Sequence, residues 1–239
     1  MSGGIAIMGW SAGCQMIFSI FGAAHNPMIA NEEYALLQQY IGKFMLYDPP
    51  HVAFGYPVPF DNKNYVPWED TSLKPEDIPV AFSEWVSSYY DHPCYDFATR
   101  SLPSSATIHD LNGIPKKTRR TSVYDWSEED KAKGIEMEAM KSEVLTFMPP
   151  SQATLCKLSE KALFDTESVS SWFPNVDVTY IGVTSTNWMC AWGEIETKRL
   201  YEAALKKNGR VIGRKIHFLD MVGLNHFVST PTSLPGELD

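Results

Sequence analysis

Residues 4–24 read GIAIMGWSAGCQMIFSIFGAA, and this stretch decides the fold class. Residues 4–9 form a short, continuous apolar run that ends at a glycine, which is typical of a parallel strand covered on both faces. From Ser11 to Ala24 the spacing becomes helical, with Met16 and Ile20 among the apolar residues that share one face. The stretch therefore predicts a strand, a turn of only a few residues, and a helix.

The same alternation returns along the chain. Asn31 is a plausible N-cap for a helix that Gly42 would end. Further apolar runs predict strands at 43–47, 176–183 and 215–221, with a helix at 192–207 that ends at Asn208-Gly209. Strands that alternate with helices imply an α/β fold with a mostly parallel sheet flanked by helices.

The middle of the chain has a different composition, richer in proline, aromatic and charged residues. It predicts helices near residues 75–90 and 127–147 and a loop at 101–122. We assign residues 57–169 to a largely helical cap insertion, and residues 1–56 and 170–239 to the core. The basic run at 116–120 is interpreted as solvated surface without a function.

Composition excludes several classes of protein. Twenty Lys+Arg against 29 Asp+Glu give a net charge of −9, the wrong sign for a protein that neutralises nucleic-acid phosphates. No apolar run approaches the roughly 20 residues of a membrane span, and no secretory leader is recognisable, so the expected location is cytoplasmic. The four cysteines, at positions 14, 94, 156 and 190, form no CxxC pair. They predict reduced, mostly buried thiols without a metal site or a disulfide framework.

Gly9-Trp10-Ser11-Ala12-Gly13 matches the pattern G-x-S-x-G between the predicted strand and helix, the context in which this pattern indicates a nucleophile. A serine at the apex of such a tight turn is strained, and side chains at positions 9 and 13 would collide with their neighbours. The Ala12 N–H, at the start of the helix, could stabilise an oxyanion on a carbonyl attacked by Ser11. The alternative is a glycine-rich turn that only permits close packing.

A serine nucleophile needs a histidine within hydrogen-bond reach. His226 is the favoured base, because it follows the last predicted strand in a loop at the carboxyl edge of the sheet, where open parallel sheets bind ligands. His217 lies inside the strand pattern and is expected to be packed. The remaining histidines fall in predicted loops or in the insertion, and we expect them to be ordinary polar surface or to line a substrate pocket: His25, His51, His92 and His109.

The third triad member should be a carboxylate that orients the imidazole, and here the residues leave alternatives open. Asp48 is the best candidate, because it follows the second strand at the same edge as Ser11 and His226. Glu194 and Glu196 are the next candidates, although their place near a helix start also suits a role with the helix dipole. The last alternative is that no functional acid exists.

These residues resemble a known family. Residues 9–13 resemble the nucleophile elbow of the α/β-hydrolase superfamily, and Gly223-Leu224-Asn225-His226-Phe227 resembles its histidine loop. The chain is similar to uncharacterised fungal members over most of its length, with the insertion in the place of the variable cap. The resemblance implies Ser11 as nucleophile, His226 as general base and Ala12 as an oxyanion donor.

The sequence also differs from the pattern of this family at two points. The family's usual acid position reads Thr184-Ser185-Thr186 here, whereas Asp48 would fill the position one strand earlier that some members use. The family has about four strands before the elbow, together with the loop that gives the second oxyanion N–H. We therefore expect a truncated sheet whose first strand is an uncovered edge through which the chain self-associates.

Two functions remain open. The first is a cofactor-independent serine hydrolase that cleaves a small apolar ester or related acyl bond through an acyl-enzyme. Aromatic residues of the insertion, such as Trp68, Trp85 and Trp126, would suit an apolar pocket or simply a core. The second is a non-catalytic remnant of the fold that at most binds a ligand or a partner chain.

Overall fold

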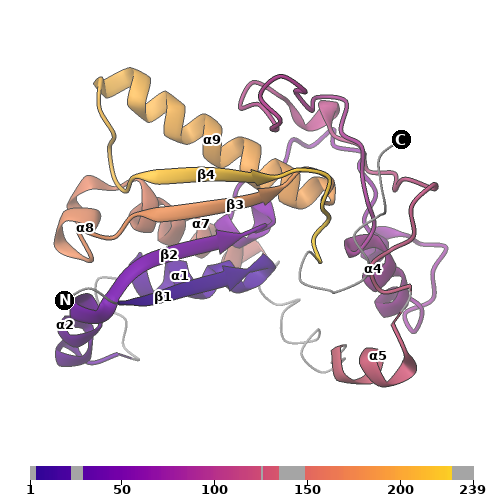
Figure 1. Cartoon of the computed structure of the whole chain (residues 1–239), viewed down its shortest axis with the longest axis horizontal. Coiled ribbons are helices and arrows are strands. Elements are labelled where there is room, and N and C mark those ends of the chain that lie inside the picture. The colour runs from indigo at the N-terminus through magenta and orange to yellow at the C-terminus, as the bar shows by residue number, and fades with distance from the viewer. Residues whose placement is uncertain (1–3, 23–28, 125, 135–148, 228–239) are drawn as a thin grey trace.

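A four-stranded parallel sheet organises the molecule. In the computed structural model, which describes residues 4–22, 29–124, 126–134 and 149–227, the strand order follows the chain. Each strand is hydrogen-bonded to the next one along the sequence, as Figure 1 shows. The strands are β1 (Ile5–Trp10), β2 (Ile41–Tyr47), β3 (Val178–Val183) and β4 (Ile216–Met221). The predicted α/β class with a parallel sheet is confirmed.

Helices connect the strands. Those near the sheet are α1 (Cys14–Phe21), α2 (Asn31–Tyr40), α3 (His51–Phe54), α7 (Pro149–Leu163), α8 (Thr166–Ser171) and α9 (Trp188–Asn208). The helix predicted from Asn31 is present, but Ala30 rather than Asn31 precedes it, and the Ala30 N–H donates to the Glu33 side chain. Gly42 lies inside β2, because the chain passes from α2 into the strand without a loop.

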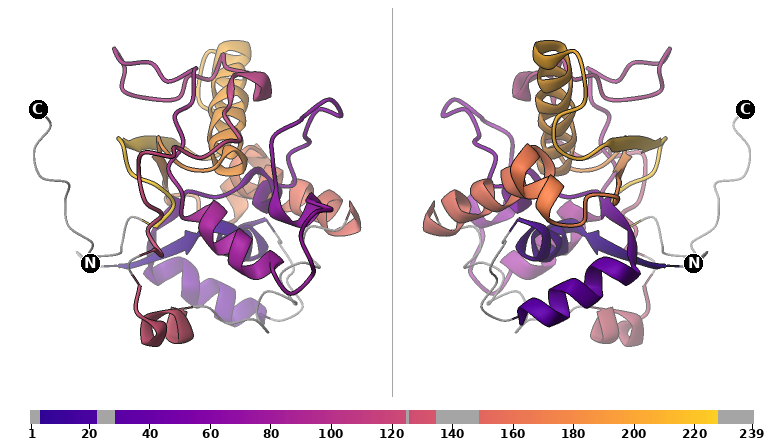
Figure 2. Two further views of the ribbon diagram at one scale, coloured as in Figure 1. Left: turned by 90° about the vertical axis from the view of Figure 1, so that its right-hand side faces the viewer. Right: turned by 90° about the vertical axis from the view of Figure 1, so that its left-hand side faces the viewer.

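The main core lies on one face of the sheet. Alternate residues of β2 and β3, such as Phe44 and Tyr180, pack there against α1, α3 and α7. Figure 1 shows α1 and α7 behind the strands, and the end-on views of Figure 2 show α7, in salmon, to one side of them. The buried residues of this cluster are Cys14, Ile17, Phe18, Phe21, Tyr34, Ile41, Phe44, Leu46, Ala53, Phe54, Tyr56, Ala162, Leu163, Phe173, Val176, Val178, Tyr180 and Ile216.

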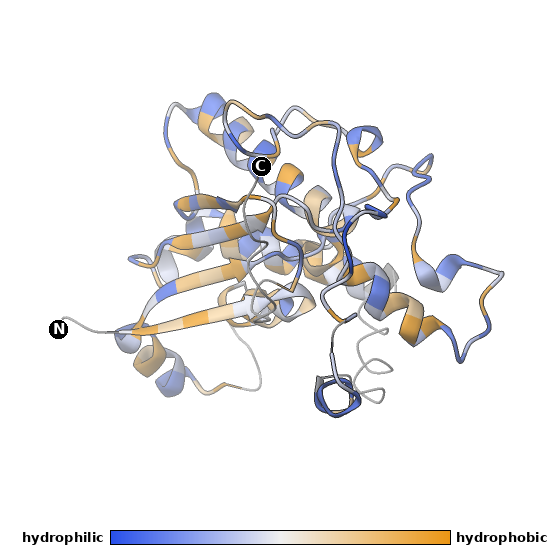
Figure 3. Ribbon diagram, turned by 45° about the vertical axis from the view of Figure 1, so that its right-hand side comes forward, coloured by the Kyte–Doolittle hydropathy of each residue, from blue (hydrophilic) through white to orange (hydrophobic). Residues whose placement is uncertain are grey.

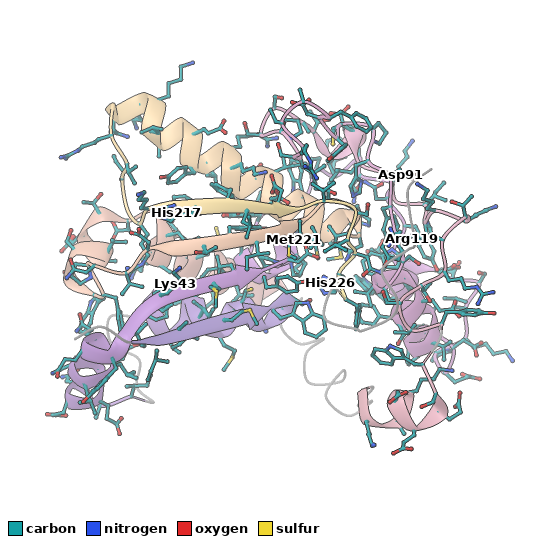
Figure 4. All side chains as sticks on the ribbon, viewed as in Figure 1. Lys43, Asp91, Arg119, His217, Met221 and His226 are labelled. Atoms are coloured by element: carbon teal, nitrogen blue, oxygen red, sulfur yellow. The ribbon has the colours of Figure 1, made fainter. Side chains whose placement is uncertain are left out.

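The opposite face carries no helix within the described part of the chain. Met8 is 57% exposed on this face, and Lys43 and His217 also lie there (Figure 4). The expectation that the first strand is covered on both faces is therefore wrong for β1. This strand pairs only with β2 among the described residues. Its ribbon is largely orange in Figure 3 because its residues are apolar, and an apolar run is compatible with one covered face as well as with two.

A second apolar cluster lies beyond the carboxyl ends of the strands. Between β2 and β3 it draws residues from α4 (Ile78–Val86), from the short 3-10 turns η2 (Pro67–Glu69) and η3 (Ile108–Asp110) and from the loops around them. α5 (Glu128–Gly134) has no buried residue, and α7, which also lies within residues 57–169, packs in the main core instead. Trp85 and Leu102 pack there against Trp188 and Trp192 at the start of α9. The helix expected at 127–147 is described only as α5, and the rest of it lies outside the described residues.

The lengths of the helices and the state of the cysteines bear on two further expectations. Among the described residues, no helix is both long enough and apolar enough to cross a bilayer. All four cysteines are free thiols. Cys14 and Cys190 are buried, but Cys156 is exposed, so the expectation of mostly buried thiols is met by two of the four cysteines.

Candidate functional site

Ser11 and Asp48 occupy neighbouring positions at the carboxyl edge of the sheet. Trp10 and Tyr47 are register partners at the ends of β1 and β2, and Ser11 and Asp48 are the next residue on each strand. Both have left-handed backbones, with φ of 54° and 44°, a conformation that is strained for residues other than glycine. The Asp48 N–H donates to the Ile181 carbonyl at 2.8 Å, which fixes the turn at Asp48 to the next strand.

The two glycines that flank the serine differ in their surroundings. A Cβ at Gly9 would lie 2.7 Å from the Cys14 Cα, so the helix could not start where it does with a side chain at position 9. A Cβ at Gly13 would meet nothing within 4 Å. The prediction that side chains at both positions would collide is therefore correct for Gly9 and wrong for Gly13, which lies on the open side of η1 (Ser11–Gly13).

His226 is paired with Asp48. Its Nδ1 lies 2.6 Å from the Asp48 Oδ2, and the two side chains are 3% and 1% exposed. The Thr186 hydroxyl donates to the same carboxylate oxygen at 2.6 Å. The Thr184-Ser185-Thr186 segment, which carries no acid of its own, thus supplies a hydrogen bond to the acid on the neighbouring strand.

Cys190, which carries no sequence motif, also lies beside this pair. The Cys190 Sγ lies 3.7 Å from the His226 Nδ1, in the first turn of α9. The Asn187 side chain caps this helix by accepting from the N–H groups of Met189 and Cys190. The signal that could have found Cys190 is its position directly after β3, at the edge where Ser11 and Asp48 also lie.

Trp10 connects the serine turn to the histidine. Its indole N–H donates to the His226 carbonyl at 3.2 Å, and the two ring centroids are 5.3 Å apart. Ser11 is the next residue and is half-buried. Within the described part of the chain, no hydrogen bond joins the Ser11 hydroxyl to His226. The imidazole contacts Asp48 through its Nδ1, so the Nε2 is the ring nitrogen that could accept a proton from a serine.

Residues between β2 and β3 hold the histidine loop in place. The Asn225 amide donates to the Ser122 hydroxyl at 2.8 Å and to the Ser87 carbonyl, and it accepts from the Phe227 N–H. Arg119 donates to the Gly223 carbonyl at 3.0 Å. Figure 4 labels Arg119 and His226 at this junction. At least one member of the basic run, interpreted as solvated surface, therefore has a structural partner.

The two alternative acids have other partners. Glu194 is buried and forms an ion pair with Lys198 at 2.5 Å, and burial raises the pKa of its carboxyl well above the usual value. Glu196 pairs with Arg199. Among the described residues neither glutamate is hydrogen-bonded to His226, whereas Asp48 is.

The other histidines correct several expectations. His217 is not packed, because its ring is half-exposed beside Asp177 on the open face of the sheet. His51 and His92 are buried rather than polar surface, and desolvation lowers the pKa of each to about 4. His109 is exposed, as expected for a loop, and His25 lies outside the described residues.

Of the tryptophans expected to line a pocket or a core, two pack at the second apolar cluster and one lies near His226. Trp85 is buried in the second cluster, and Trp68 packs on it. Trp126 contacts Phe227, which in turn contacts Trp10 with ring centroids 5.2 Å apart. Aromatic side chains therefore surround the outer side of His226.

Comparisons of the chain with protein-family models, with curated protein sequences and with solved structures found no match. Function is therefore inferred from the geometry and chemistry of the residues around Asp48 and His226.

Proposed function

We propose that this protein is a serine hydrolase that cleaves an ester or related acyl bond. The observation that carries the proposal is the buried hydrogen bond between Asp48 and His226, formed at the edge where Ser11 directly follows the adjacent strand. A carboxylate on Nδ1 holds the imidazole in the tautomer whose Nε2 accepts a proton. This is the arrangement that a serine hydroxyl needs in order to become a nucleophile at neutral pH.

The proposed reaction has two halves. The Ser11 Oγ attacks the acyl carbonyl while the His226 Nε2 takes its proton, and the resulting imidazolium gives that proton to the departing alkoxide. Water then attacks the acyl-Ser11 ester, again losing a proton to His226, and the acid product leaves as Ser11 is reprotonated. Asp48 remains ionised and stabilises the imidazolium in both halves.

The turn after Ser11 suits the oxyanion of this reaction. The first N–H groups of a helical segment have no partner within the helix, and they carry the positive end of its dipole. We assign the Ala12 N–H as one donor to the oxyanion. Trp10 and Phe227, which cover His226, favour a small apolar acyl group over a charged one.

The order of the elements supports a relation to the α/β-hydrolase fold. The serine follows β1, the acid follows the adjacent β2, and the histidine follows β4 on the far side of β3. The part of the region between β2 and β3 that contains α4 packs beyond the carboxyl ends of the strands, where a cap over the site would lie. Membership of that superfamily remains part of the proposal.

A burst experiment tests the proposal. The purified full chain is mixed with p-nitrophenyl acetate and with p-nitrophenyl butyrate, and p-nitrophenol is followed before and during steady turnover. An acyl-enzyme predicts a burst close to one equivalent, lost in Ser11→Ala and kept in the control Ser170→Ala, whose serine is exposed on α8. Equal hydrolysis by wild type and Ser11→Ala would reject Ser11 as the nucleophile.

A second candidate function is a non-catalytic binding domain of the same fold. Two observations favour it: the Ser11 hydroxyl is not hydrogen-bonded to His226, and one sheet face carries no described helix. Such a domain would self-associate through the outer edge of β1, which pairs only with β2 among the described residues. Sedimentation velocity separates the cases, because a concentration-dependent dimer without a burst favours the binding domain, and an active monomer rejects it.

A further inference from the structure

We propose that Asp48, Cys190 and His226 form a binding site for a thiophilic divalent cation such as Zn²⁺, and that occupation of this site switches the hydrolase off. The inhibitory part rests on the proposed function, whereas the metal site itself does not. The three residues come from three different segments: the end of β2, the first turn of α9 and the loop after β4.

The spacing of the three ligand atoms is close to that of a tetrahedral zinc centre. One ligand atom from each residue lies within 4.8 Å of the other two. Zinc–ligand bonds of about 2.0–2.3 Å at tetrahedral angles put S and N about 3.5 Å apart and N and O about 3.3 Å apart. The Cys190 Sγ and His226 Nδ1 are 3.7 Å apart and already fit, while the His226 Nδ1 and Asp48 Oδ2, at 2.6 Å, need to separate by a fraction of an ångström.

The chemistry of the three groups matches a borderline-soft cation. Sulfur, imidazole nitrogen and a single carboxylate oxygen are the ligands that zinc takes in proteins, and three of them leave a fourth position for water. The double positive charge of the ion would balance the charges of the buried Asp48 carboxylate and Cys190 thiolate. Zinc binds the thiolate rather than the thiol, so binding at Cys190 must release a proton and should strengthen as the pH rises.

Neighbouring side chains are placed to orient the ligands. The Thr186 hydroxyl donates to the Asp48 carboxylate, and the Asn187 amide donates to the Cys190 sulfur at 3.4 Å. Such outer contacts fix the direction of metal ligands and are a regular part of metal sites. Asp48, Cys190 and His226 are all buried, so we expect slow entry of the ion past Trp10.

The inhibitory effect follows from the tautomer of His226. In the proposed catalytic state the Nδ1 carries the proton that is donated to Asp48, and the Nε2 lone pair accepts from Ser11. A cation on the Nδ1 lone pair requires neutral imidazole to carry its proton on Nε2 instead. His226 then has no site at which to accept the Ser11 proton, and Asp48 no longer orients it.

Cobalt absorption tests the site without reference to activity. The wild-type chain is incubated with Co²⁺, and the thiolate-to-cobalt charge-transfer band in the near ultraviolet is recorded. The band is expected in wild type and in the control Cys156→Ser, which removes the exposed cysteine, and absent in Cys190→Ser. Cys190→Ala replaces Cys190→Ser if thermal melting shows the latter to be unfolded. A band that persists without Cys190, or disappears with Cys156→Ser, overturns the site.

Zinc inhibition tests the consequence. Hydrolysis of p-nitrophenyl acetate is measured with and without preincubation in Zn²⁺, and each variant is compared with itself. We expect Zn²⁺ to slow wild type and Cys156→Ser at least tenfold and Cys190→Ser less than twofold. Equal slowing of wild type and Cys190→Ser overturns the inhibitory role. If wild type shows no hydrolysis even without Zn²⁺, the proposed function fails, and the cobalt band alone decides whether the site exists.

Discussion

The His226 Nδ1 lies 2.6 Å from the Asp48 Oδ2, and the bond joins residues 178 positions apart in the chain. Both side chains are buried, and burying either polar group without the other as its partner would cost free energy. The contact ties the loop after β4 to the end of β2 across β3. It is also the contact on which the proposed general base depends.

Asp48→Asn should abolish most of the activity without unfolding the chain. An amide can keep the contact but holds the imidazole in the wrong tautomer, which lowers the rate in a serine protease by roughly 10⁴-fold. We expect kcat/KM for p-nitrophenyl acetate to fall by about that factor. Glu196→Gln, whose side chain pairs with Arg199, is the control and should change kcat/KM less than twofold. Comparable losses in both variants would remove Asp48 from the triad.

Alanine should be harmful at Gly9 and harmless at Gly13. A Cβ at Gly9 presses on the backbone of Cys14, and overpacking of this kind lowers the free energy of unfolding by about 1–3 kcal/mol. Gly13 has helical angles and open space around it, so Gly13→Ala should raise stability by about 0.4–1 kcal/mol. Urea unfolding of the two variants measures both values, and a reversed order would contradict the structure of the turn.

Asn225→Ala should weaken both the histidine loop and the proposed activity. The change removes the hydrogen bonds from the Asn225 amide to the Ser87 carbonyl and from the Phe227 N–H to the Asn225 side chain, and each lost hydrogen bond costs about 0.5–1.5 kcal/mol. We expect a lower unfolding free energy and a fall in kcat with little change in KM, because the loop carries His226. Asn208→Ala, at an exposed helix end, is the matched control. Unchanged kcat in Asn225→Ala would separate the loop from catalysis.

Stability should fall as the pH is lowered from about 6.5 to about 4. Desolvation lowers the pKa of His51 and His92 to about 4, so over this range the unfolded chain binds protons that the folded chain does not. Each histidine contributes about 3 kcal/mol to the loss, which levels off below the folded pKa. His92 is also held neutral by the Asn112 N–H, which donates to its Nδ1 at 3.1 Å.

Urea unfolding at pH 7 and pH 4.5 checks this dependence. His92→Gln should lose roughly half of the difference in unfolding free energy between the two pH values, because His51 remains. His109→Gln removes an exposed histidine and should leave the difference as in wild type. A wild-type stability that is flat over this range would contradict the burial of both imidazoles.

Local pattern accounts for the parts of the fold that the sequence predicts well. The apolar run before Gly9, the short turn and the helical spacing after it all lie within one contiguous stretch, and the structure has β1, η1 and α1 there. Asp48 could be proposed because parallel strands end at one edge of a sheet. Gly209, with φ of 65°, ends α9 as expected for a glycine after a helix.

Features that depend on distant parts of the chain could not be predicted. The run at β1 is apolar whether one face or two are covered, so the exposure of Met8 depends on the packing of other segments. His92 is buried because the loop after α4 folds back on Thr186, whose carbonyl lies 3.0 Å from the His92 Nε2. Cys190 carries no motif, and only the tertiary fold brings it beside His226.

Labelling with a fluorophosphonate probe tests the central claim most directly, because this reagent forms a covalent bond with a serine only when a neighbouring base activates it. We predict a single adduct, located by peptide mass spectrometry on Ser11, whose rate of formation falls strongly in Asp48→Asn and which is absent in Ser11→Ala. A folded wild-type sample that remains unlabelled, or an adduct that forms equally fast without Asp48, would contradict a triad of Ser11, His226 and Asp48.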